Sequence, residues 1–195
     1  KRIGHSNTVP MDLKMDNVNI VLITGPNAGG KTVTLKTTGL LVCLALAGIP
    51  IPANPDSNFL LFEKVLVDIG YAQSIEDDLS TFSSHLKNIK QIIEEADEKT
   101  LIVLDEIGTG TDPAEGAAID AGMLITLRDK GAKVLATTHH GSLKLAANQL
   151  DKFQNASMEF DTEHLQPTYK FNQGTPGSSY AFEVANRIGF DEKFI

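Results

Sequence analysis

The chain has 195 residues, of which 42% are hydrophobic and 22% charged, and its formal net charge is −8. This length is enough for one domain with a sizeable core, and we expect a single domain over residues 1–195. An acidic chain without a stripe of Lys and Arg is a poor match for proteins that grip a nucleic-acid backbone directly.

The longest apolar run, residues 40–47, is too short to span a bilayer, and no charged region with a cleavage site is evident. Both features favour an intracellular, cytoplasmic protein. The one cysteine, Cys43, lies in this run, which favours a place in the core over a nucleophilic role. The chain begins at Lys1 rather than Met, so we expect a fragment of a longer protein.

In chain order, residues 1–16 predict an entry strand or loop, and an apolar run predicts a buried strand over 18–24. A helix follows over 32–47 and ends at Gly48. This order, strand then glycine-rich turn then helix, is the context that a phosphate-binding loop requires.

The spacing between this strand and this helix is Gly25, four residues, then Gly-Lys-Thr, which is the phosphate-binding loop pattern. Glycines let backbone N–H groups point at phosphate oxygens, and the helix directs its positive end at the same anion. Lys31 reaches the outer phosphates, and the Thr32 hydroxyl can ligate Mg²⁺. We therefore predict an ATP and Mg²⁺ site that includes Gly25, Pro26, Asn27, Ala28, Gly29, Gly30, Lys31, Thr32 and Val33.

Residues 49–62 are rich in Pro and Asn and predict a loop, and residues 64–69 predict a short strand. A helix is predicted from 79 to 95, where apolar residues recur at helical spacing. Ser80 lies at its start, where a serine commonly does no more than cap the helix.

A second buried strand is predicted over 100–104, and Asp105 and Glu106 follow it directly. Such an apolar run followed by two acids is the Walker B pattern. Asp105 would hold Mg²⁺ through water, and Glu106 would act as general base on the attacking water. Two solvated acids in a turn are the alternative, which the upstream phosphate loop makes weak.

Residues 112–129 predict a helix that begins with an Asp cap and a Pro, and its small residues suggest close packing against the sheet or another subunit. The next strand, 133–137, leads to His139, which we predict to sense or neutralise the γ-phosphate. The remaining elements are a short helix over 141–149, a hairpin of strands 155–160 and 168–171, and a closing helix over 180–188.

Four motifs in this order resemble those of MutS-family ATPase domains, most closely the MutS-two branch. They are the phosphate loop, a signature motif, a Walker B motif with its adjoining loop, and a switch-histidine strand, at residues 25–32, 79–82, 105–111 and 136–139. The resemblance spans nearly the whole chain. It implies an α/β fold, a P-loop NTPase of ABC type, with a mostly parallel sheet flanked by helices and an antiparallel portion.

The resemblance also implies a homodimer that buries ATP between two domains. Ser80 of one protomer would then serve the γ-phosphate bound by the other, and Asn27 would lie near that phosphate. Val9 and Pro10 resemble the segment that packs on adenine, and Gln73 resembles a Q-loop glutamine. The resemblance implies that the full protein is a DNA-binding clamp with a long coiled coil and commonly a Smr nuclease domain. Neither the coiled coil nor the nuclease domain is in these residues.

The leading interpretation is Mg²⁺-dependent ATP hydrolysis that drives such a clamp, in control of DNA recombination or in repair. The main alternative is a nucleotide-gated dimerisation module with little intrinsic hydrolysis. A transporter ATPase would need an LSGGQ-type signature where this chain has LSTFS, and a small-molecule kinase would need an Arg-rich lid.

Overall fold

The computed structural model describes residues 8–26, 29–69, 78–108, 111–161, 163–164 and 166–177. They form one six-stranded sheet in the order β2-β3-β4-β1-β5-β6. Five strands run parallel, and β6 pairs antiparallel with β5. The α/β fold of a P-loop NTPase of ABC type, with a mostly parallel sheet and an antiparallel portion, is therefore confirmed.

The elements follow the predicted order. They are β1 (Ile20–Thr24), α1 (Lys31–Leu46), β2 (Lys64–Asp68), α2 (Asp78–Glu95), β3 (Thr100–Leu104), α3 (Pro113–Asp129), β4 (Lys133–Thr137), α4 (Gly141–Ala147), β5 (Phe153–Asp161) and β6 (Gln166–Gln173). The entry segment 8–16 is a loop rather than a strand. The closing helix predicted over 180–188 lies outside the described residues.

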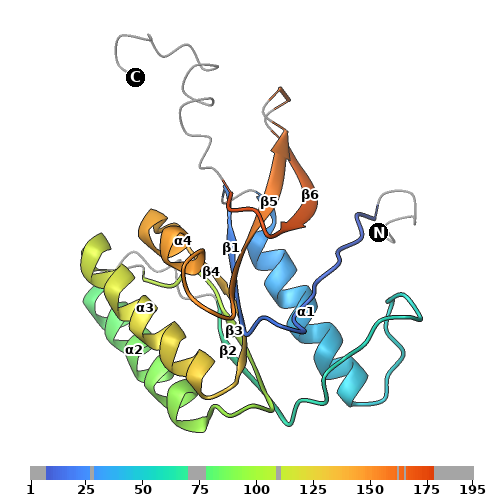
Figure 1. The fold of residues 1–195 in the computed structure, drawn as a ribbon, viewed down its shortest axis with the longest axis horizontal. Helices are drawn as coiled ribbons and strands as arrows, with labels where there is room; N and C mark the ends of the chain where they lie inside the picture. The colour runs from blue at the N-terminus through green and yellow to red at the C-terminus, as the bar shows by residue number, and fades with distance from the viewer. Residues whose placement is uncertain are drawn as a thin grey trace.

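Helices cover both faces of the sheet (Figure 1): α1 lies on one face, and α2, α3 and α4 lie on the other. Strands β1 and β3 are buried on both faces, which explains their unbroken apolar sequences. The α1 face is filled by Leu35 and Val42 against alternate residues of β1 and β3. The other face is filled by apolar residues of the three remaining helices.

Helix α1 corrects the expectation for Cys43, which is exposed rather than in the core. Residues 40–46 are apolar all around the helix, but only the face with Leu35 and Val42 packs on the sheet. Cys43 follows Val42 by one residue, a rotation of roughly 100° along a helix, and so it points away from the sheet. Leu40 is exposed for the same reason, at 59%.

The register of the central strands fixes where the functional groups gather. Ile23 of β1 pairs with Thr137 of β4, and Leu104 of β3 pairs with Ala136. The carboxyl ends of these three parallel strands therefore meet at one edge of the sheet, which is where ligands bind in open α/β sheets. Within the described part of the chain, no helix is long and apolar enough to cross a membrane.

Candidate nucleotide-binding site

The phosphate loop joins β1 to α1, as predicted. Gly25 and Gly30 have φ values of +132° and +93°, in the region that favours glycine. The Thr34 amide donates to the Gly30 carbonyl at 2.9 Å and begins the helix. Among the described residues, no side-chain hydrogen bond caps this helix at Gly30, and N–H groups at a helix N-terminus are suited to an anion. Asn27 and Ala28 lie outside the described residues.

Lys31 is held at the mouth of this loop. Its ammonium group donates to the carbonyl oxygens of Gly25 at 2.7 Å and Pro26 at 3.1 Å. The residue is only 2% exposed, and burial lowers the pKa of its amine, against the opposing effect of Glu106 and Asp105. The ammonium group therefore lies at the loop, within electrostatic range of the two predicted acids.

The hydroxyl of Thr32 donates to the Asp105 carboxylate at 2.8 Å. The predicted Mg²⁺ ligands from the phosphate loop and from the end of β3 therefore lie in direct contact, although 73 residues separate them. A hydroxyl and a carboxylate are the oxygen donors that Mg²⁺ prefers, with water and phosphate completing its shell. The described residues hold no cluster of three or more His, Cys, Asp or Glu side chains that could bind a metal. The Thr32 hydroxyl and the Asp105 carboxylate supply two oxygen donors, a set that fits a Mg²⁺ ion to which nucleotide phosphates and water would also bind.

Thr137, at the end of β4, is a site residue that the sequence reasoning missed. Its hydroxyl donates to the other carboxylate oxygen of Asp105 at 2.6 Å and accepts from the Glu106 amide at 2.7 Å. It thereby fixes both acids at the end of β3. The sequence offered one signal for this role, which is a hydroxyl residue at the end of the strand that leads to His139.

The two predicted catalytic groups Glu106 and His139 face each other, with Nε2 of the histidine 3.6 Å from Oε1 of the carboxylate. Burial lowers the pKa of His139, as does the nearby charge of Lys31, while Glu106 acts in the opposite direction. Glu106 adopts a φ of +49°, a strained conformation for a side-chain-bearing residue. Strain of this kind is often found where a side chain must be aimed at a reacting group.

The turn after Glu106 packs tightly against α3 and α4. Gly108 has a φ of +78°, and a Cβ built there would overlap the Asp120 carboxylate and the His140 ring. His140 Nε2 lies 3.2 Å from the Gly108 carbonyl oxygen. A Cβ on Gly116 would lie 2.6 Å from that same oxygen. The small residues of α3 therefore serve packing against this turn.

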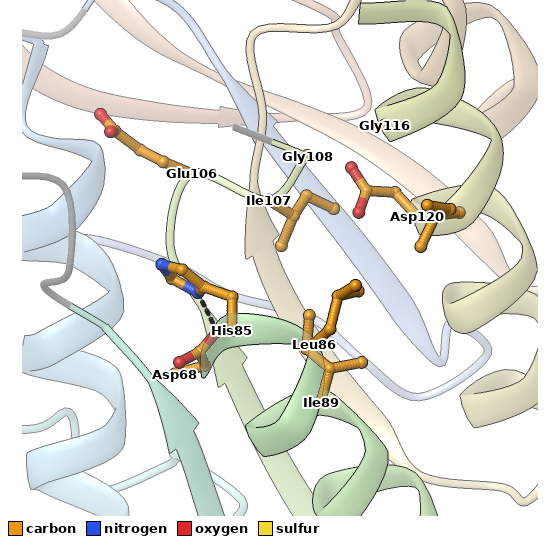
Figure 2. Close-up of a pocket in the computed structure, with 10 residues that line it drawn as sticks. Asp68, His85, Leu86, Ile89, Glu106, Ile107, Gly108, Gly116 and Asp120 are labelled. Carbon is orange, nitrogen blue, oxygen red and sulfur yellow. Dashed lines mark hydrogen bonds and ion pairs between the residues drawn. The ribbon is translucent and has the colours of Figure 1, made fainter. Parts of the chain in front are cut away.

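A cavity of about 20 Å³ lies behind this turn, large enough for roughly one water molecule. Asp68 and His85 lie on one side of it and Asp120 on the other (Figure 2). Asp120 is 2% exposed, and its Oδ2 has no hydrogen-bond partner among the described residues. Burial raises the pKa of this carboxyl to about 7.

Other predicted residues are placed less completely. The backbone of Ser80 lies in the first turn of α2, and its side chain is not described. Val33 lies in the first turn of α1, and its side chain is 61% exposed. Val9 and Pro10 are exposed, and none of the contacts described for this chain joins them to the phosphate loop. Gln73 lies outside the described residues.

Tyr169 of β6 lies against the phosphate loop, which the sequence reasoning did not anticipate. A Cβ built on Gly30 would lie 2.9 Å from Cδ1 of its ring, and the residue is 51% exposed. Its φ of +60° is strained for an aromatic residue. The fold therefore holds a half-exposed aromatic ring beside the loop.

Comparison with known proteins shows similarity along the whole chain. The family model described as MutS domain V matches residues 21–195. Endonuclease MutS2 of Caldicellulosiruptor saccharolyticus and Endonuclease MutS2 of Clostridium beijerinckii are each 50% identical over 194 residues. Each match covers 99% of this chain and 25% of the relative. The chain therefore spans about a quarter of the length of the curated relatives it matches.

Two glycines of α3 allow a matched test of the packing beneath the turn. We expect Gly116→Ala to destabilise the protein by about 1–3 kcal/mol and to lower any ATPase activity, because the new methyl group displaces the Gly108 carbonyl. Gly122→Ala meets nothing within 4 Å and should instead stabilise the helix by about 1 kcal/mol. Urea unfolding of both variants measures the difference, and equal effects would contradict this account.

Asp120 should make stability depend on pH. Its pKa is raised in the folded state, so the folded protein holds a proton that the unfolded chain releases above pH about 4. Stability is therefore lost as pH rises from 4 to 7, by up to roughly 4 kcal/mol, and the loss is complete above pH 7. Asp120→Asn removes this penalty. Its stability relative to the wild type, measured by urea unfolding, should rise between pH 5 and pH 8, and a constant difference would refute the assignment.

Proposed function

The chain belongs to the MutS family, as a domain V, and we propose that it binds Mg²⁺-ATP and hydrolyses it at an interface between two copies. MutS domain V is the ATPase domain of that family. The observation that carries the proposal is the direct hydrogen bond between Thr32 and Asp105. This bond joins the start of α1 to Asp105, the first Walker B acid. Lys31 and Glu106 are the residues that follow the phosphate loop's last glycine and Asp105, so they lie next to the bonded pair in the chain.

In this proposal each charged group has one task. The N–H groups of residues 29–32 and the ammonium of Lys31 bind the phosphates. Thr32 and Asp105 would hold Mg²⁺, which neutralises charge that develops on the phosphates. Glu106 takes the proton of the attacking water, and its strained backbone aims the carboxylate. His139 contacts Glu106 and orients it toward the γ-phosphate.

In this proposal, the second copy contributes to the site through its helix α2. Its first turn carries Ser80, which we propose acts on the ATP that is bound by the partner, as the family resemblance implies. The N-terminus of a helix of this length attracts phosphate. ATP would then bind the two domains together.

The role of the whole protein is also a proposal, because the chain spans about a quarter of its relatives. We propose that cycles of ATP binding and hydrolysis drive a DNA-binding clamp in repair or recombination control, in the cytoplasm. The net charge of −8 is consistent with DNA contacts that lie in other parts of such a protein.

Substitution of Glu106 tests this function. Glu106→Gln keeps the shape of the side chain but removes the base, so turnover should fall at least 100-fold while Mg²⁺-ATP binding persists. Steady-state hydrolysis and equilibrium binding measure the two quantities, and light scattering with and without ATP measures dimerisation. Unchanged turnover would refute the role of Glu106. Negligible wild-type turnover with strong ATP-dependent dimerisation would identify a nucleotide-gated dimerisation module instead.

Tyr169 should contribute to nucleotide affinity by stacking on the base. Aromatic stacking is worth about 1–3 kcal/mol per base, so Tyr169→Ala should weaken ATP binding roughly tenfold, and Tyr169→Phe should change it little. Both variants keep the strained backbone at this position, so the comparison isolates the ring. Calorimetric titration with ATP and with inorganic triphosphate makes the test, because only the affinity for ATP should depend on the ring. Equal effects on both ligands would contradict stacking.

A further inference from the structure

The last residue of β2 links α2 to the Walker B strand. Asp68 is 2% exposed, and each of its carboxylate oxygens accepts a hydrogen bond from α2. Nδ1 of His85 lies 2.8 Å from Oδ2, and Nδ2 of Asn88 lies 2.8 Å from Oδ1. Figure 2 shows His85 directed onto Asp68 at the edge of the cavity. Two side chains of one helix therefore hydrogen-bond to a single buried carboxylate.

The same residue also contacts the nucleotide site through its backbone. The carbonyl oxygen of Asp68 accepts from the Asp105 amide at 2.9 Å. Asp105 in turn holds the hydroxyls of Thr32 and Thr137. A continuous chain of hydrogen bonds thus runs from the phosphate loop, through Asp105 and Asp68, to α2.

We propose that Asp68, His85 and Asn88 are positioning residues. They fix the position of α2 so that its first turn can contact the ATP that is bound by the partner subunit. The inference rests on the proposed function, in which α2 acts across the dimer. His85 and Asn88 are three residues apart and so share one face of the helix. Ile89 and Ile92 anchor the next turns in the core. His85 and Asn88 thus hold the second and third turns of α2, between the first turn, which carries Ser80, and the apolar residues that pack in the core.

These hydrogen bonds fix α2 to the end of β3, because Asp68 contacts Asp105 through its backbone and His85 and Asn88 through its carboxylate. In the proposed dimer, a helix that is fixed in this way presents its N-terminus to the ATP of the partner subunit. The alternative is that His85 and Asn88 have a structural role alone. They would then only supply hydrogen bonds to the Asp68 carboxylate, because burying a carboxylate without partners destabilises the protein.

Single variants provide the first test. We expect His85→Leu to lower ATP hydrolysis at least tenfold while ATP binding to its own phosphate loop changes less than twofold. His85→Asn keeps a donor near the position of Nδ1 and should restore most of the activity. Lys90→Ala, on the exposed face of the same helix, is the matched control and should match the wild type. Wild-type activity in His85→Leu would overturn the proposal.

Mixing subunits provides the decisive test. Lys31→Ala removes the phosphate-loop cation but leaves α2 intact, whereas His85→Leu does the reverse. In an equal mixture half of the dimers are mixed, and each mixed dimer has one site with both parts intact. The mixture should therefore recover about a quarter of wild-type activity, although each variant alone is nearly inactive. No recovery would mean that His85 acts only within its own subunit, which would overturn the proposal.

The outcomes separate this inference from the proposed function. If Lys31→Ala alone hydrolyses ATP as fast as the wild type, the proposed function itself fails. If His85→Leu does not fold, as judged by circular dichroism, Asn88→Ala takes its place in the mixture, because it leaves the bond from His85 intact. Asn88→Ala should itself lower hydrolysis at least tenfold, and wild-type activity in that variant alone would overturn the proposal. Recovery of activity in its mixture with Lys31→Ala supports the proposal, and the absence of recovery overturns it.

Discussion

The structure depends on the position of one carboxylate. Asp105 lies at the end of a strand that is buried on both faces, and an acid placed there needs partners. Its carboxylate accepts hydrogen bonds from the hydroxyls of Thr32, next to the phosphate loop, and Thr137 of β4. Its backbone amide donates to the carbonyl of Asp68 in β2. One residue thus joins four segments that lie far apart in the sequence, and the register of the parallel sheet makes their meeting possible.

The turn that follows concentrates strain and tight packing. Glu106 and Gly108 both have positive φ values, and a strained non-glycine residue costs about 1–3 kcal/mol. Thr137 offsets part of this cost, because its hydroxyl and its carbonyl accept from the amides of Glu106 and Ile107. Packing against Gly116 and Asp120 leaves the turn little room to relax. The protein therefore holds the carboxylate of Glu106 on a stiff support rather than on a free loop.

Much of this arrangement was predictable from the sequence, because it follows from local patterns. The strands 100–104 and 133–137 were predicted to the residue, since apolar runs that end in polar groups mark buried parallel strands. Lys31, Thr32, Asp105 and Glu106 meet as their motifs require. Other features depend on tertiary contacts that no pattern encodes. Thr137, Asp120 and Tyr169 acquire their positions from neighbours on other elements. The exposure of Cys43 was not predicted, because residues 40–46 are apolar all around the helix and do not reveal which face the sheet will cover.

That exposure also makes the molecule easy to observe. Cys43 is the one thiol in the chain and lies twelve residues after Lys31 on the same helix, roughly 18 Å along its axis. A spin label or fluorophore attached there would sit well away from the phosphate loop, on a rigid element that moves with it. In a pair of labelled copies, the separation between the two probes would report on the approach of the domains in real time, without a substitution anywhere in the site.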